Sequence, residues 1–172
     1  MSSLRERLAP ICVLALRLSL AGWVGSAVLY VVTSVAEQTS PDFDSRIRDQ
    51  LATIRFPLYY LFGGIMLLLA LISGLASIVC CRGCIRKRVT AAFVFTMLSA
   101  AGAAADYVWV YQPLQQLISP PGQARDQRFI NLHNWSRHAN EVHLTLAMIA
   151  AVLACLPSRG ELDAGCEIKL KS

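Results

Sequence analysis

Four long apolar stretches divide the chain, and short polar segments separate them. The apolar stretches lie at about residues 8–36, 56–80, 89–112 and 130–157. A helix of roughly 20 apolar residues crosses the hydrocarbon core of a bilayer, which is about 30 Å thick. The pattern therefore predicts an all-α fold, an integral membrane up-down bundle of four helices, within a single membrane domain that covers residues 1–172.

The fourth stretch differs from the others because its purely apolar part is short. Residues 144–156 would form about 20 Å of helix, which is less than the bilayer core. The two turns before it carry polar and ionisable side chains, and such groups are costly near the bilayer interior. We therefore expect a polar cluster near one membrane face, built from this helix: Arg137, His138, Asn140, Glu141 and His143.

Two further patterns predict contact with the membrane surface. In the polar segment at residues 38–55, apolar residues recur every three or four positions, which favours a short amphipathic helix lying on the membrane. Aromatic residues gather at the ends of the second and third stretches, as in an interfacial aromatic belt. The belt residues would be Tyr59, Tyr60, Tyr107, Trp109 and Tyr111.

The charge pattern predicts the orientation. The chain has 172 residues, of which 55% are hydrophobic and 16% charged, and its net charge is +5. The basic residues sit in short loops, above all in the loop at 81–88, which indicates membrane topology rather than nucleic-acid binding. We expect both termini to be cytoplasmic, in the plasma (inner) membrane, with residues 158–172 as a short mobile cytoplasmic tail. The six cysteines fall on or near this side, where thiols stay reduced.

Small residues predict close packing between helices. They occur at four-residue spacing in residues 21–26 and form an almost unbroken run at residues 99–105. Such faces let membrane helices approach closely, so the lipid bilayer and a second copy of the chain are the expected partners. Arg17 lies about three turns into the first stretch, where it would snorkel to the headgroups or, alternatively, face inward and bind an anion.

Two groups of side chains are candidates for metal or redox chemistry. Cys81 and Cys84 could ligate a metal or form a redox pair, with only the distant Cys166 as a further ligand. The three histidines lie on one helix, so two of them cannot hold a haem from facing helices within one chain. No nucleophile, phosphate-loop or zinc-protease motif is present, so we predict neither an enzyme nor a cofactor.

The polar cluster is the main candidate site. Asp106, near the end of the third helix, should lie level with the start of the fourth helix and form an ion pair with Arg137. A helical repeat is also expected to place one stripe of polar residues on this helix, formed by His133, Arg137, Asn140 and Glu141. Such a cluster is either a structural network or a small binding site, and its other members would be Arg55, His138 and Glu141.

Four short motifs, in order along the chain, resemble the transmembrane protein 205-like family, a four-helix membrane domain of unknown function. They are Gly22-Trp23-x-Gly25, Phe56-Pro57-x-Tyr59, Trp109 followed by Pro113, and Phe129-x-x-x-His133-x-x-Ser136-x-x-x-Asn140. The resemblance implies four helices with a short loop between the second and third. It also implies that His133, Ser136 and Asn140 form the polar cluster of the family.

These observations predict a non-enzymatic integral membrane protein whose polar cluster, at the non-cytoplasmic end of the third and fourth helices, is structural or binds a small ligand. One alternative is a subunit of an oligomeric transporter or channel. It would require oligomerisation, because four helices rarely enclose a pathway alone. A second alternative is a metal-binding or redox membrane protein that uses the cysteines or histidines.

Overall fold

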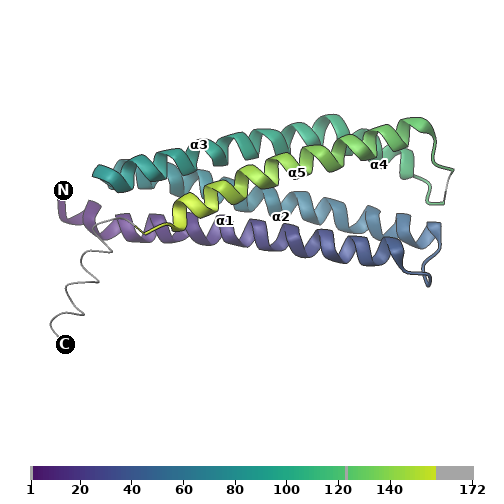
Figure 1. Cartoon of the computed structure of the whole chain (residues 1–172), viewed down its shortest axis with the longest axis horizontal. Helices are drawn as coiled ribbons and strands as arrows, with labels where there is room; N and C mark the ends of the chain where they lie inside the picture. Colours follow the sequence, from purple (N-terminus) through teal and green to yellow (C-terminus); the bar gives the residue numbers. More distant parts are fainter. Residues whose placement is uncertain (1, 123, 158–172) are drawn as a thin grey trace.

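Four long helical spans run up and down beside one another in the computed structural model, which describes residues 2–122 and 124–157 (Figure 1). Each span is long and apolar enough to cross a membrane, which confirms the predicted all-α arrangement of four candidate membrane helices. The described chain ends and the α2–α3 turn lie at one end of the bundle, which we call the turn end. The α1–α2 and α4–α5 connections lie at the other, the loop end. The elements are α1 (Ser2–Thr39), α2 (Ser45–Cys80), α3 (Gly83–Asp106), the π-helical turn η1 (Tyr107–Tyr111), α4 (Gln112–Ile118) and α5 (Gln127–Cys155).

The second span begins earlier than the hydropathy pattern predicts. The side chain of Asp44 accepts a hydrogen bond from the backbone N–H of Ile47 (2.8 Å) and caps α2 at Ser45. The prediction of a separate surface helix in residues 38–55 is therefore wrong, because most of this segment forms the first turns of α2. With 36 residues, α2 is about 54 Å long, well beyond the roughly 30 Å of a bilayer core.

The loop between the second and third spans is shorter than predicted. α3 begins at Gly83, where φ is +59°, so that only Cys81 and Arg82 connect it to α2. The basic residues expected in a loop at 81–88 thus lie mostly on the first turns of α3. The short connection makes α2 and α3 an antiparallel hairpin, in agreement with the predicted up-down arrangement.

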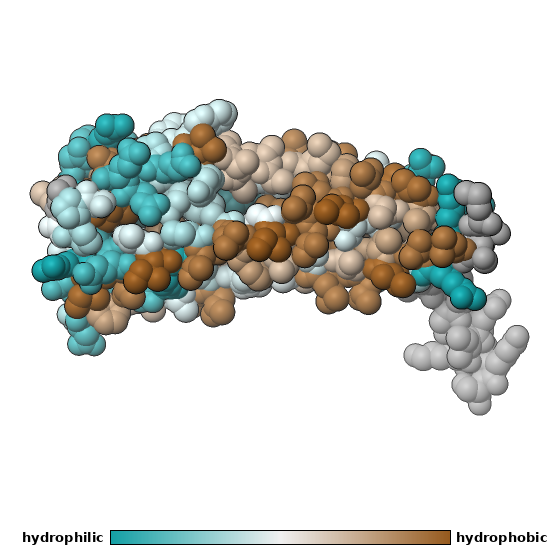
Figure 2. Space-filling view, turned by 180° about the vertical axis from the view of Figure 1, so that it is seen from behind, coloured by the Kyte–Doolittle hydropathy of each residue, from teal (hydrophilic) through white to brown (hydrophobic). Residues whose placement is uncertain are grey.

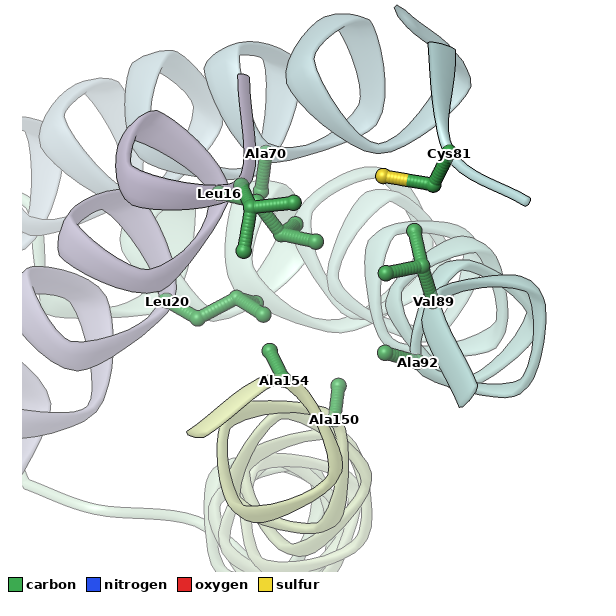
Figure 3. Packing of buried hydrophobic residues seen from close by; sticks show 9 residues of the cluster. Leu16, Leu20, Ala70, Cys81, Val89, Ala92, Ala150 and Ala154 are labelled. Atoms are coloured by element: carbon green, nitrogen blue, oxygen red, sulfur yellow. The ribbon is translucent and has the colours of Figure 1, made fainter. Parts of the chain in front are cut away.

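Small and branched apolar side chains fill the centre of the turn end (Figure 3). Leu16 and Leu20 of α1 are fully buried there, and alanines of the other helices let the backbones approach them. The outer surface is apolar over much of its length, whereas hydrophilic residues gather at the loop end (Figure 2). The cluster consists of Val13, Leu16, Leu20, Ala70, Cys81, Val89, Ala92, Ala150 and Ala154.

Arg17 makes a contact that neither of its two predicted roles included. Its Nε donates a hydrogen bond to the backbone carbonyl of Ala154 (2.7 Å), and the side chain is half-buried. The last four carbonyls of a helix lack partners within the helix, and a cation near them also interacts favourably with the helix dipole. Since α5 ends at Cys155, Arg17 caps the C-terminus of α5 from α1.

At the loop end, a buried carboxylate holds the chain together. Asp49 of α2 is only 3% exposed, and it accepts hydrogen bonds from the backbone N–H of Gly122 (2.9 Å) and from Nη2 of Arg125 (2.7 Å). Gly122 has a φ of +89°, which a residue with a side chain rarely adopts. This clamp ties the first turns of α2 to the α4–α5 connection, and sequence reasoning did not find it.

The third span is interrupted by the wider turn η1, and Pro113 gives the physical reason. Proline has no N–H to donate, and its ring clashes with the carbonyl four residues earlier, so a regular α-helix cannot continue through it. The backbone N–H of Gln112 bonds to the carbonyl of Tyr107, five residues back. The wider turn follows directly after Asp106, and such turns are frequent at functional sites.

Candidate functional site

Two neighbouring tyrosines of α2 connect the polar residues of α3 and α5. The hydroxyl of Tyr60 donates to Oδ2 of Asp106 (2.6 Å), and the hydroxyl of Tyr59 donates to Oδ1 of Asn140 (2.8 Å). Ser136 of α5 lies close to both Tyr60 and Asp106. Three residues singled out from the sequence, Asp106, Ser136 and Asn140, are thus brought together, but through tyrosines that the sequence had suggested for the membrane surface.

The predicted ion pair between Asp106 and Arg137 is wrong. Asp106 is 3% exposed and bonds to Tyr60, whereas Nε of Arg137 lies 3.7 Å from Oε1 of Glu141 on the exposed side of α5. His138 belongs to the same exposed group, with its Nδ1 3.4 Å from Oε2 of Glu141. The inward face of α5 carries residues 136, 140, 143 and 147, whereas the outer face carries residues 137, 138 and 141.

Two further predicted members of the cluster lie elsewhere. The imidazole ring of His133 stacks on the ring of Phe129, with centroids 5.9 Å apart. Arg55 forms an ion pair with Glu37, donates to Oγ1 of Thr33 (2.6 Å) and lies over the ring of Tyr30. Arg55 therefore joins α2 to α1 rather than contributing to the cluster around Asp106.

His143, which the sequence placed in the polar cluster without singling it out as a site residue, is the main functional candidate in the structure. It is 1% exposed, and within the described part of the chain neither ring nitrogen has a hydrogen-bond partner. Its ring is nearly parallel to that of Trp23, with the centroids 6.4 Å apart, and the Nε1 of Trp23 is also buried without a partner. Buried polar groups usually find partners, so these nitrogens mark a place where a ligand could bind.

The backbone around His143 is fixed by α3. The hydroxyl of Ser99 donates to the backbone carbonyl of His143 (2.7 Å). A Cβ added at Gly102 would lie 3.1 Å from Cβ of His143, so the glycine allows α3 to pack closely on α5. The sequence signal for His143 was its spacing of three residues from Asn140 and four from Ala147, which continues the inward face.

A cavity of about 620 Å³ opens between α2 and α3, and Trp23 and His143 contribute to its wall from the other two spans. Its volume lies within the range of about 300–1,000 Å³ that is usual for ligand pockets. Most lining side chains are apolar. The lining residues are Trp23, Pro57, Tyr59, Tyr60, Leu61, Gly63, Gly64, Ile65, Leu67, Leu68, Leu71, Ala100, Ala103, Ala104, Tyr107, Tyr111, Gln115 and His143.

Large and small side chains explain why this cavity exists. The ring of Tyr60 packs against Tyr107 and Tyr111, with centroids 5.2 and 4.5 Å apart, and these rings stand between α2 and η1. On the turn-end side of these rings, α2 presents Gly63 and Gly64, and α3 presents alanines. Small side chains on both helices cannot fill a gap that the tyrosine rings hold open, so a cavity is left.

The aromatic belt predicted from the sequence is therefore mostly an internal aromatic stack. Tyr59 and Tyr111 are buried, and Tyr59 packs against Trp23 with the ring centroids 5.1 Å apart. Tyr107 and Trp109 differ, because they are 38% and 74% exposed. Of the residues predicted for the belt, Trp109 is the most exposed and fits an interfacial anchor best.

The cysteines near the α2–α3 turn are separated by their environments. Cys81 is buried and Cys84 is exposed. Burial raises the pKa of the Cys81 thiol, which disfavours the thiolate that ligates metals or reacts. Among the described residues, no group of three or more His, Cys, Asp or Glu side chains could hold a metal ion. Cys166 and the predicted mobile tail lie outside the described residues.

Comparisons of the chain with protein-family models, with curated proteins and with solved structures find no match. The resemblance to the transmembrane protein 205-like family consequently stays a prediction. The candidate site rests on the geometry around the cavity.

Proposed function

We propose that the protein is a multi-pass membrane protein that binds a small lipid-soluble molecule in the cavity between α2 and α3. It is a binding protein rather than an enzyme. The hydrogen bonds from Tyr59 and Tyr60 to α5 and α3 hold the helices around the cavity. The polar network is thus structural, and the binding site lies next to it.

The observation that carries this proposal is the pair of unpartnered ring nitrogens of His143 beside an open cavity. A buried polar group without a partner costs about 1–3 kcal/mol. A ligand that bonds to His143 would recover part of this free energy. A purely structural histidine would be expected to bond to a neighbouring side chain or carbonyl instead.

The wall of the cavity also supports entry from the lipid. Leu61 and Leu68 line the cavity although each is about 60% exposed on the outside of α2, whereas Leu67 lines it and is buried. The cavity therefore reaches the apolar outer surface between α2 and α3. A molecule dissolved in the bilayer could enter sideways, without crossing a polar surface.

We infer that the turn end is cytoplasmic and that the membrane is the plasma (inner) membrane. The basic first turns of α3 and Arg82 support this orientation, because positive residues in short connections stay on the cytoplasmic side. The exposed thiol of Cys84 provides the test. It should react with a membrane-impermeant thiol reagent only after cells are opened, and reaction in intact cells would contradict this orientation.

A transporter subunit is the second candidate, and Asp106 favours it. Ionisable residues inside membrane spans often belong to ion or proton pathways, and Asp106 directly precedes the π-helical turn η1. This alternative predicts substrate flux in liposomes that Asp106→Asn abolishes while the bundle stays folded.

The binding proposal is tested by filling the cavity. Ala103 lines it, whereas Ala101, two residues earlier, is exposed and absent from its wall. The wild-type protein and the control Ala101→Phe, purified from native membranes in mild detergent, should retain one small organic molecule detectable by mass spectrometry of a solvent extract. Ala103→Phe should lose it.

A second variant distinguishes a blocked cavity from a misfolded protein. Ala104 lies at the exposed mouth of the cavity, so Ala104→Phe should narrow the entrance without straining the core. Helix content measured by circular dichroism establishes that each variant is folded. The same extract from all four proteins would refute the proposed function.

A further inference from the structure

We propose that the ligand is a neutral amphiphile with one hydroxyl group and a long apolar body, and that His143 binds the hydroxyl at the inner wall of the cavity. This inference rests on the proposed function and adds the chemical class of the ligand. The class follows from three properties of the wall: its donors and acceptors, its charge and its apolar surface.

The donors and acceptors of the wall favour a hydroxyl group. A neutral imidazole has one N–H donor and one nitrogen acceptor, and both nitrogens of His143 lack partners. The two nitrogens point in divergent directions, so one hydroxyl group bonds to one of them, and it suits either tautomer because it can accept from the N–H or donate to the bare nitrogen. A ketone or ester can only accept, so it suits only the tautomer whose N–H faces the cavity. The Nε1–H of Trp23 is a further unpartnered donor on a residue of the same wall.

The charge of the wall excludes an ionised head group. The lining residues include no Asp, Glu, Lys or Arg side chain. Asp106, the only acidic residue of α3, is not among them, and its Oδ2 accepts the hydrogen bond from Tyr60. A carboxylate or ammonium group in this cavity would lie near the bilayer interior without a counter-charge, which is strongly unfavourable. The head group is therefore neutral.

The rest of the wall fits an apolar chain. The lining includes the buried His143 of α5, the small Ala100 and Ala103 of α3, and Leu61 and Leu68 of α2, which are exposed on the outer surface. The wall is thus polar and buried at His143 and apolar and exposed at the two leucines. An amphiphile can place its hydroxyl group at the closed end and leave its tail between α2 and α3, in contact with lipid.

The fluorescence of Trp23 reports ligand binding directly, because Trp23 lines the cavity. The chain has three tryptophans, and the other two, Trp109 and Trp135, are 74% and 69% exposed. In the background Trp109→Phe and Trp135→Phe, tryptophan fluorescence reports only on Trp23. The protein, reconstituted in vesicles, is titrated with a dibrominated long-chain alcohol, the dibrominated alkane of equal length and the corresponding fatty acid in its ionised form. Bromine quenches tryptophan at short range.

We expect the alcohol to quench Trp23 saturably and to bind about tenfold more tightly than the alkane, as about one hydrogen bond would give. The ionised acid should quench only weakly. His143→Phe keeps an aromatic ring beside Trp23 but removes both nitrogens, so it should abolish the preference for the alcohol while the alkane still binds. His143→Gln, which restores a donor and an acceptor, should recover part of the preference.

The outcomes separate this inference from the proposed function. If alcohol and alkane bind equally, or if the preference survives in His143→Phe, the hydroxyl assignment is wrong although the cavity still binds ligands. Binding of the ionised acid as tight as that of the alcohol would refute a neutral head group. If no probe quenches Trp23 saturably, or if Ala103→Phe leaves quenching unchanged, the cavity is not a binding site and the proposed function fails as well.

Discussion

Replacing Gly63 by alanine tests the packing between α1 and α2 at the wall of the cavity. A Cβ at this position would lie 2.4 Å from Cη2 and Cζ3 of Trp23, whereas carbon atoms in contact normally lie about 3.5–4.0 Å apart. Trp23 is 2% exposed and is flanked by Tyr59 and His143, with ring centroids at 5.1 and 6.4 Å. The indole ring is therefore confined, and either the ring or the helix must shift.

The neighbouring glycine provides a matched control. A Cβ at Gly64 would meet no atom within 4 Å. Both substitutions gain the same helix propensity, about 1 kcal/mol in favour of alanine. The difference between the two variants therefore isolates the overlap with Trp23. Overpacking in a dense core costs about 1–3 kcal/mol, so Gly63→Ala should be less stable than Gly64→Ala by about this amount.

The assay is unfolding in mixed micelles of mild detergent and sodium dodecyl sulfate, followed by the loss of helical circular dichroism. Gly64→Ala should unfold at or above the wild-type midpoint and Gly63→Ala below it. Trp23→Leu should relieve the overlap, so the cost of Gly63→Ala should shrink in the double variant. Equal midpoints for Gly63→Ala and Gly64→Ala would refute the packing of Trp23 over Gly63.

Two further predictions concern contacts that join distant parts of the chain. Asp49→Ala leaves the N–H of Gly122 without its partner and should lower the free energy of unfolding by about 1–3 kcal/mol in the same assay. The control Asp42→Ala removes an exposed carboxylate and should have little effect, so equal losses would contradict the clamp. Arg17→Gln removes the charged donor to the carbonyl of Ala154 and should speed hydrogen–deuterium exchange in the last turn of α5, but not in its first turn. Unchanged exchange in the last turn would show that this cap contributes nothing.

Much of the fold could be predicted because the signals are local. A long apolar run must form a helix in a bilayer, where no water can satisfy backbone groups. The helix boundaries were less predictable. Asp44 caps α2, which begins at Ser45, eleven residues before the expected start at 56, because the polar turns of α2 lie at the loop end, where hydropathy no longer indicates a span. The third stretch was expected to end at about 112, whereas the span continues past Pro113 through the wider turn η1 into α4.

The candidate site was predicted in part. Asp106, Ser136 and Asn140 do face the centre of the bundle, since a helical repeat places Ser136 and Asn140 on one stripe. Arg137 was assigned to the wrong side of α5. Charge complementarity suggests which groups could pair, but the rotation of a helix decides which groups do. Arg137 instead forms an ion pair at the surface with Glu141, which lies one turn away on the same helix.

The sequence by itself determined that this protein has four candidate membrane helices, because apolar length and the pattern of interruptions are properties of each segment alone. The tertiary structure decided how those helices rotate and how closely they approach. It turned Tyr59 and Tyr60 inward as hydrogen-bond donors and placed His143 against Trp23. It also left a cavity where glycines and alanines face each other beside a stack of tyrosines. The physical reason is that a cavity and an unpartnered nitrogen belong to several helices at once, so no single segment encodes them.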